Sequence, residues 1–267
     1  MKKQNKIIAM RHNKVRKANE IIQRSRFSLS TQQQRIILYL ISQITPFDDD
    51  FKLYDFSIFE FCKVCGIEQY SGKNYQDLKN AIKEIADKSM WLTLENGTHT
   101  LIRWIEKPYI NDNSGIIQIR LDKDLKPYLL QLKRNYTQYE LYWTLNFKSK
   151  YSIRLYELVK SIHYNELEIF EKQYSLEELR NLLDANKYTV YQDFKKRVLI
   201  PAMTEINKYS DKTIDFKPVK ECRTVTAIRF IIVSKSAEQR AEVKSLIDTN
   251  LGGEQLTLFD VLEGSNW

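Results

Sequence analysis

The chain contains one short pattern twice, and this repetition constrains its fold more than any other feature. The stretch 75-YQDLKNAIKEIADKS-89 opens with nearly the same residues as 191-YQDFKKRVLIPAMTEIN-207. A shorter helix is predicted before each copy, from Ser57 and from Ser175, because each serine has a glutamate three residues later in a capping-box pattern. With 267 residues the chain has room for two domains of ordinary size. The repeat therefore predicts two domains of the same fold.

Capping and turn residues predict the elements around the first copy. Ser30 and Gln33 form another capping-box pattern, ahead of apolar residues that recur on one helical face as far as Ile44. After the helix that begins near Tyr75, two strand-like segments flank Asn96-Gly97, a dipeptide typical of tight hairpin turns. The first half is thus expected to contain three helices followed by a hairpin.

The second half repeats this order. Its expected elements are a helix over 149–162, a short helix from Ser175, a helix from about Tyr188, and strands over 211–219 and 226–233 around the basic loop 220–223. Three helices and a hairpin are typical of the winged helix, whose third helix enters the DNA major groove while the hairpin wing reaches the flanking backbone. The predicted fold class is α+β, with two tandem winged-helix domains related by an internal repeat. The alternative is two small α+β domains that only pack on each other.

The third helix of the second half carries three consecutive cations. At about 100° per residue, Lys196 and Arg197 lie mostly off the apolar arc of this helix, near the N-terminal end that recognition helices direct at base edges. A Lys or Arg there can pair with guanine, whereas the alternative is a solvated face without a ligand. We expect DNA contacts from Gln192, Lys195, Lys196 and Arg197 on the helix and from Lys220 and Arg223 on the wing.

Pro201 distinguishes the second copy of the pattern from the first. In a regular helix it removes the hydrogen bond to the carbonyl of Arg197, at a cost of roughly 3 kcal/mol. We therefore expect a bend that aims the N-terminal turns differently from the C-terminal ones. The first copy has no proline and places Lys79 at the matching position, so it is expected to make the weaker DNA contacts.

Three stretches resemble one family, the iteron-binding initiator Rep proteins of theta-replicating plasmids. They are 29-LSTQQQRIILYLISQI-44, 136-YTQYELYWTLNFKSKYSIRLYELVKSI-162 and 193-DFKKRVLIPAMTEIN-207, and the likeness covers roughly residues 25–235. The resemblance implies two winged-helix domains that recognise short direct repeats in double-stranded origin DNA. It also places the basic recognition-helix positions of the family on Lys195, Lys196 and Arg197.

The same resemblance implies how work is divided between the domains. The second domain would make the main base contacts, and the first would contribute dimerisation and auxiliary DNA contact. Dimers would repress the initiator's own gene at an operator, monomers would open the origin, and host replication proteins would be partners. The expected limits are 1–24 for a basic N-terminal arm, 25–133 and 134–236 for the two domains, and 237–267 for an acidic flexible tail.

The charge of the chain also favours a nucleic-acid ligand. The formal net charge is +8, and Glu20 is the only acid between Met1 and Arg35. Cations this dense are expected to stay in solvent and contact phosphates. They are Lys2, Lys3, Lys6, Arg11, Lys14, Arg16 and Lys17.

The sequence contains no pattern typical of an enzyme. The stretch 66-GIEQYSGK-73 has the wrong spacing for a phosphate loop, and the three histidines are isolated, which argues against a rolling-circle nickase. Cys62 and Cys65 lack the second pair that a zinc site needs. We expect a non-enzymatic, cytoplasmic bacterial protein without cofactor, metal or membrane contact. The remaining alternative is a winged-helix transcriptional repressor without a replication role.

Two apolar segments outside the third helices suggest contacts with other molecules. Both faces of the hairpin around Asn96-Gly97 are partly apolar, so residues 116–121 and 125–132 of the same chain, or a second copy of the chain, should cover one face. Near the C-terminus, a glutamine, a leucine and a Leu-Phe pair resemble the peptide by which bacterial proteins bind the replicative sliding clamp; the alternative is a segment that folds back on the body. These residues are Gln255, Leu256, Leu258 and Phe259.

Overall fold

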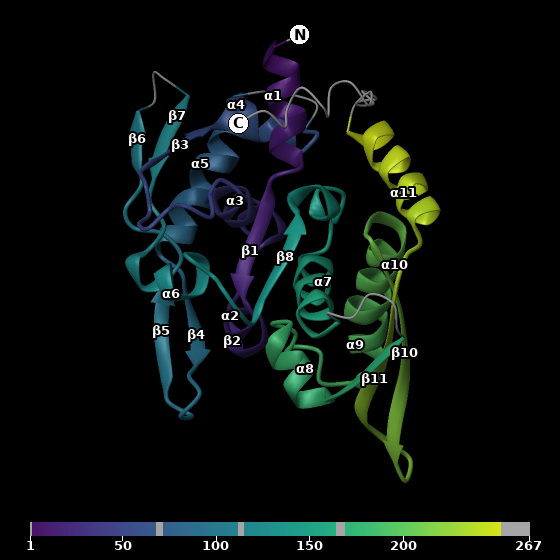
Figure 1. Ribbon diagram of the computed structural model, residues 1–267. Helices are drawn as coiled ribbons and strands as arrows, with labels where there is room; N and C mark the ends of the chain where they lie inside the picture. Colours follow the sequence, from purple (N-terminus) through teal and green to yellow (C-terminus); the bar gives the residue numbers. More distant parts are fainter. Residues whose placement is uncertain (1, 68–71, 112–114, 164–168, 252–267) are drawn as a thin grey trace.

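The computed structural model describes residues 2–67, 72–111, 115–163 and 169–251. Figure 1 shows two units side by side. Each contains the three helices and the hairpin that the repeat predicts. The predicted class of two tandem winged-helix domains is confirmed. Within these ranges, no helix is both long and apolar enough to cross a membrane.

The first domain is built around three helices. Ser30 caps the first of them with a complete capping box, in which its hydroxyl and the Gln33 side chain each satisfy a backbone N–H. Ser57 caps the second by accepting from the Glu60 N–H at 3.3 Å. The elements are β2 (Ser25–Arg26), α3 (Thr31–Ile41), β3 (Tyr54–Ser57), α4 (Ile58–Val64), α5 (Gly72–Ala86), β4 (Ser89–Thr93), β5 (His99–Arg103), β6 (Tyr109–Asn111), β7 (Ile116–Ile119), the short helical turn η1 (Lys123–Leu125) and α6 (Lys126–Leu129).

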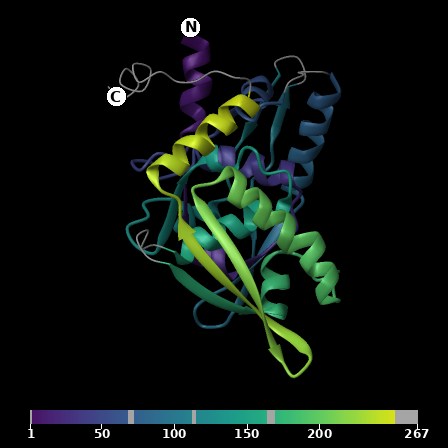
Figure 2. The same cartoon turned by 90° about the vertical axis from the view of Figure 1, so that its right-hand side faces the viewer.

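The second domain repeats the three helices and the hairpin. Ser175 caps its second helix by accepting from the Glu178 N–H at 3.0 Å. Its elements are β8 (Tyr136–Glu140), η2 (Leu141–Thr144), α7 (Lys150–Ile162), β9 (Phe170–Ser175), α8 (Leu176–Leu182), α9 (Tyr191–Phe194), η3 (Lys195–Leu199), α10 (Ile200–Tyr209), β10 (Lys212–Glu221) and β11 (Thr224–Ser234). Figure 2 shows the β10–β11 wing as a long hairpin at the end of the molecule opposite α1 (Lys2–Arg11).

The two halves differ in the strand that completes the wing sheet. In the second domain, β9 lies between α7 and α8 in the chain and pairs with β11, which gives the order β10-β11-β9. In the first domain the corresponding strand, β3, pairs with β7 instead, and the strand that joins the wing is β2. The repeat is therefore closest in the helices and looser in the sheets.

The expected basic arm over residues 1–24 is corrected by the structure, because much of it packs against the body. After α1 come β1 (Lys14–Ala18), which pairs with β8 of the second domain, and α2 (Asn19–Arg24), which buries Ile21 and Ile22. Arg11 is only 7% exposed and donates to the carbonyls of Val64, Lys63 and Leu251. The segment packs because its backbone pairs with β8 and because the buried guanidinium of Arg11 is hydrogen-bonded to carbonyl oxygens. The density of cations therefore did not keep it in solvent.

A buried ion pair lies where β1 meets the second domain. Lys17 Nζ is 2.6 Å from Glu157 Oε1, and their side chains are 7% and 2% exposed. The Tyr139 hydroxyl donates to the same carboxylate oxygen at 2.6 Å. Burial lowers the pKa of Lys17, while attraction to Glu157 acts in the opposite direction. The N-terminal strand thus links the two domains through a charge pair shielded from solvent.

The expected flexible tail over residues 237–267 is also corrected in its first part. Residues 237–250 form α11 (Ala237–Asn250), which has a complete capping box at Ser236 and Gln239 and buries Val243 and Ile247. The Tyr142 hydroxyl donates to Asp248 Oδ1 at 2.8 Å and holds the helix against η2. Residues 252–267, with Gln255, Leu256, Leu258 and Phe259, lie outside the described part of the chain.

Candidate nucleic-acid interface

The turn between α8 and α9 fixes where the third helix of the second domain begins. Arg180 on α8 donates from Nη2 to the carbonyl of Thr189 at 2.7 Å, and its guanidinium lies 5.4 Å from the centre of the Phe194 ring. Lys150 at the start of α7 pairs with Asp184 in this turn at 2.6 Å. These contacts attach the N-terminal end of the helix to both preceding helices, so its direction is set by the domain core.

One face of this third helix is fully buried. The stretch runs without interruption through α9, η3 and α10, from Tyr191 to Tyr209. At the end of the helix, the Asn207 side chain donates to the carbonyl of Ile214 and accepts from its N–H, which attaches the helix to the wing. The residues with no exposed surface are Phe194, Val198, Leu199, Ala202 and Ile206.

The opposite face carries the predicted cations. Gln192, Lys196 and Arg197 are exposed, and Lys195 is partly exposed at the edge of the buried face. Within the described part of the chain, none of the three cations has a hydrogen-bond or ion-pair partner. Some other cations of the protein are paired, as Lys160 is with Asp211 at 2.9 Å. The helix therefore presents unneutralised positive charge, which suits a polyanionic ligand.

The bend expected at Pro201 takes the form of a wider helical turn. The segment η3 is π-helical over Lys195–Leu199, and the Ile200 N–H donates to the carbonyl of Lys195, five residues back. Pro201 follows at the start of α10, where it has no N–H to complete a regular helix. The widened turn contains all three cations, and single π-turns of this kind are frequent at functional sites.

The wing of the second domain places two further cations at its tip. Lys220 is the penultimate residue of β10 and lies next to a register shift, and Arg223 follows Cys222, whose φ of 55° closes the turn. Both cations are exposed, and in the described residues neither has a hydrogen-bond or ion-pair partner. Figures 1 and 2 both place this tip beyond α8 and α9, away from the body. A ligand on the third helix could therefore also be contacted by the wing.

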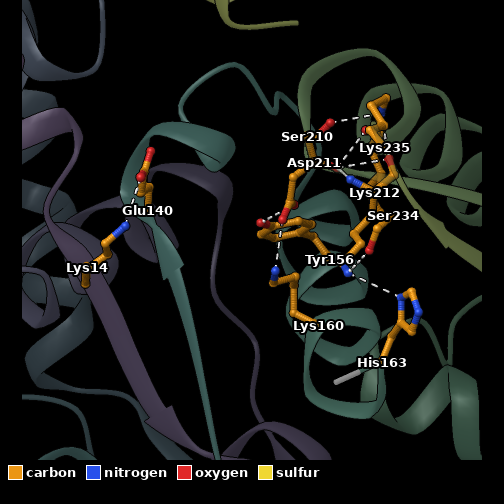
Figure 3. Close-up of polar contacts among 11 residues, drawn as sticks. Lys14, Glu140, Tyr156, Lys160, His163, Ser210, Asp211, Lys212, Ser234 and Lys235 are labelled. Carbon is orange, nitrogen blue, oxygen red and sulfur yellow. Dashed lines mark hydrogen bonds and ion pairs between the residues drawn. The ribbon is translucent and has the colours of Figure 1, made fainter. Parts of the chain in front are cut away.

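A buried polar network fixes the base of the wing against α7 (Figure 3). Asp211 accepts from the Tyr156 hydroxyl at 2.8 Å and from Lys160 at 2.9 Å. Lys212, which is fully buried, donates from Nζ to Ser234 Oγ at 2.6 Å. The network crosses from α7 to both strands of the hairpin, so the angle of the wing is coupled to the helix beneath it.

Lys235 completes the network by donating to two backbone carbonyls. Its Nζ lies 2.8 Å from the Ser210 oxygen and 2.7 Å from the Lys212 oxygen. Burial lowers the pKa of Lys235 to about 8, although the charge of Asp211 opposes this change. Burial of the ammonium costs free energy, and its two hydrogen bonds to carbonyl oxygens offset part of that cost. This is the arrangement expected for a group with a structural role.

The first domain presents less free charge on its third helix. Lys79 lies on α5, as predicted, and is partly buried. The exposed residue after it is Asn80, where the second domain has a cation. That the second domain is the main binding element, with auxiliary contact from Lys79, stays a prediction.

The β4–β5 hairpin of the first domain exposes an apolar pair. Trp91 and Leu101 are direct cross-strand neighbours and are 53% and 51% exposed. Of the two segments suggested as a cover, residues 116–121 begin with β7, which lies between β3 and β6 in a separate sheet, and residues 125–132 begin at the end of η1, which contacts β5 on the buried side of the hairpin. The outer face of the hairpin is therefore apolar and accessible.

The cysteines and acids of the described residues do not form a metal site. Cys62 and Cys65 are buried in the first domain, and burial raises the pKa of Cys65 to about 12. In the ranges that the structure describes, no three His, Cys, Asp or Glu side chains gather as metal ligands would.

Two features of the interface were not predicted from the sequence. They are the anchoring role of Arg180 and the exposure of Ile200, at 40%.

The fold and the free cations define a tandem winged-helix protein with a basic third helix. Comparison with known families gives the particular class. The model described as "Initiator Replication protein, WH1" matches residues 14–160, and "Initiator Rep protein, WH2" matches residues 175–232. The chain belongs to this family of replication initiator proteins. The first match extends into α7, beyond the limit at residue 133 that the sequence suggested, so the exact division remains a prediction.

Two individual proteins are similar to this chain. A replication initiation protein of Escherichia coli is 25% identical over 203 residues, which are 73% of this chain and 62% of the relative. The chain thus spans less than two thirds of that relative's length. A crystal structure of the Pi initiator protein in complex with iteron DNA superposes with a TM-score of 0.67, covering 85% of this chain and 99% of the other at 19% identity. At that identity the match supports the fold.

Proposed function

We propose that the protein is a sequence-specific DNA-binding initiator of plasmid replication, and that the third helix of its second domain reads the bases. One observation carries this proposal: Lys196 and Arg197 are exposed and unpaired on a helix whose other face is anchored in the core. In winged-helix proteins the third helix enters the major groove, where Lys and Arg pair with guanine O6 and N7. Gln192 lies one turn earlier and can contact adenine or a phosphate.

The DNA sites are proposed to be direct repeats at an origin. The Pi initiator, which shares the fold, was crystallised with iteron DNA, and the family of this chain is one of replication initiators. The same proposal includes repression of the protein's own gene and recruitment of host replication proteins. It also includes binding of the sliding clamp by Gln255, Leu256, Leu258 and Phe259. Double-stranded DNA is the partner that the described residues support most directly.

Selection from random DNA tests the proposed sequence specificity. The full chain is mixed with duplexes that contain a random central segment, and bound molecules are amplified over several rounds at fixed salt. We expect one short motif to be enriched, with at least one guanine at an invariant position. Failure to enrich any motif would leave a non-specific DNA-binding protein and would overturn the proposal.

The wing cations are predicted to contact phosphates. Lys220→Ala and Arg223→Ala should each reduce the slope of log affinity against log salt by about 0.9 on duplex DNA, with the preferred sequence unchanged. Lys244→Ala removes a cation from α11 and should leave the slope unaltered. The measurement is fluorescence anisotropy at several salt concentrations. An unchanged slope in both wing variants would show that the wing does not contact the backbone.

The exposed hairpin of the first domain is predicted to mediate self-association. Trp91 and Leu101 are adjacent and accessible, and burial of each in a symmetric interface would contribute about 1.5–3 kcal/mol. Trp91→Ser with Leu101→Ser should therefore raise the dimer dissociation constant at least 100-fold, as measured by analytical ultracentrifugation. Ile169→Ser, at an exposed isoleucine of the second domain, is the control. Equal dimerisation of wild type and double variant would place the interface elsewhere.

A further inference from the structure

An exposed isoleucine lies on the same face of the third helix as the free cations. Ile200 is 40% exposed, and it lies outside the buried face of the helix. A β-branched side chain has low helix propensity, so solvent exposure and local conformation both disfavour isoleucine at this position. A lysine or glutamine would be more stable here in the free protein. The choice of residue therefore suggests a contact with a ligand.

The position of Ile200 relative to the cations follows from the burial pattern. Asp193, Lys196, Arg197, Ile200 and Thr204 are exposed, whereas the residues between them include the fully buried Val198, Leu199 and Ala202. Residues three and four apart on a helix are surface neighbours, so Ile200 lies next to Lys196 and Arg197. The cations and this apolar side chain thus form one continuous surface.

The backbone around Ile200 holds this surface in place. The Ile200 N–H closes the π-helical turn by donating to the Lys195 carbonyl, and Pro201 follows it directly. Its neighbours Leu199 and Ala202 are fully buried in the domain core. Ile200 therefore projects from a rigid part of the helix, and little conformational freedom would be lost when it contacts a ligand.

The major groove offers one apolar group for such a side chain. Guanine presents acceptors to Lys or Arg, whereas thymine presents its C5 methyl group to apolar residues. Lys196 and Ile200 are four residues apart, which is about 6 Å along a helix, and successive base pairs are about 3.4 Å apart. Contacts from the two side chains would therefore fall within about two base pairs of each other.

We propose that Ile200 is a specificity-determining residue that contacts the methyl group of a thymine within two base pairs of the guanine bound by Lys196 or Arg197. The inference rests on the proposed function, because it assumes that this helix lies in the major groove. It adds a preference that the cations alone cannot provide, since Lys and Arg do not distinguish thymine from cytosine by an apolar contact.

Removal of single thymine methyl groups tests this contact. Each thymine of the selected site is replaced in turn by deoxyuridine, which keeps the base pair and deletes only the methyl group. Affinity of the full chain is measured for each duplex with wild type, Ile200→Ala and the control Ile169→Ala, another exposed isoleucine of the same domain. Circular dichroism checks that the variants are folded.

We expect one thymine, or two adjacent ones, at which wild type and the control lose about fourfold in affinity, the effect of roughly one buried methyl group. Ile200→Ala should bind the unmodified site about fourfold more weakly or worse and should show no further loss with deoxyuridine at that position. An equal deoxyuridine effect in wild type and Ile200→Ala, or no effect at any thymine, would overturn the inference. The proposed function would still stand if Lys196→Ala weakened binding, and would fall separately if it did not.

Discussion

Replacing Lys196 and Arg197 together by alanine should reduce affinity for the cognate DNA at least about 30-fold. Each side chain is exposed and unpaired in the described structure, so each is available for a bidentate contact with guanine. One such contact discriminates between bases by about 1–3 kcal/mol, and the double variant removes both cations from the centre of the recognition surface. Each single variant should lose roughly 5- to 150-fold and accept more bases at one position of the site.

The same variants should leave the fold unchanged. Neither side chain contributes to the buried face, which is formed by Phe194, Val198 and their apolar neighbours. Anisotropy with cognate and scrambled duplexes measures the affinity, and circular dichroism monitors the helices. Lys208→Ala removes an exposed cation from the far end of the same helix and should affect cognate and scrambled DNA alike. Wild-type affinity in both Lys196→Ala and Arg197→Ala would show that another element reads the bases.

Replacement of Lys17 by methionine should destabilise the protein by about 3–5 kcal/mol. The substitution keeps most of the side-chain volume but leaves Glu157 buried without its cation, and removal of one partner of a buried ion pair typically has this cost. Lys14→Met is the matched control. Its partner Glu140 is on the same pair of strands, but the two side chains are 39% and 21% exposed, so about 1 kcal/mol or less is expected.

Urea unfolding followed by tryptophan fluorescence measures this difference as a shift in the midpoint. The double variant Lys17→Met with Glu157→Gln should recover part of the loss, because the carboxylate that lost Lys17 is then neutral, while the buried Arg154 loses the attraction of Glu157. If Lys17→Met is no less stable than Lys14→Met, the β1–β8 pairing does not join the two domains in the way described here.

The helices and the β4–β5 hairpin were predictable because their determinants are local. The side chains of Ser30, Ser57 and Ser175 cap the helices as the sequence indicates, and Gly97 closes its turn with a φ of 81°. These features depend on residues a few positions apart, so a single sequence suffices to find them. The exposed cations of the third helix followed in turn from its apolar periodicity.

The pairing of β1 with β8 could not be predicted in the same way. It joins Lys14 to Glu140 and Ala18 to Tyr136, across more than a hundred residues, and no local pattern specifies such a partner. The density of cations before Arg24 suggested a solvated arm, whereas buried acceptors such as Glu157 neutralise them. The helix α11 was not predicted, because it buries only Val243 and Ile247 and its apolar face is too narrow to indicate a packed helix.

The π-helical turn was partly foreseeable. Pro201 indicated that a regular helix was disfavoured, but a bend and a widened turn both accommodate a missing N–H, and the sequence does not choose between them. The core decides between the two conformations. Val198 and Leu199 are adjacent and both fully buried, and a turn with one extra residue allows both side chains to face the core. The exposure of Ile200 does not depend on that choice, because at 100° per residue it already lies opposite the buried face; the sequence pattern contained this signal, although it was not used.

A footprint on the DNA beside the protein's own gene tests the central claim most directly. Wild-type protein should protect a series of evenly spaced direct repeats from nuclease cleavage, with each repeat in the same orientation. Lys196→Ala with Arg197→Ala should protect none of them at the same concentration, although both proteins are folded. Equal protection by the double variant, or protection of a single inverted repeat in place of direct repeats, would contradict the account.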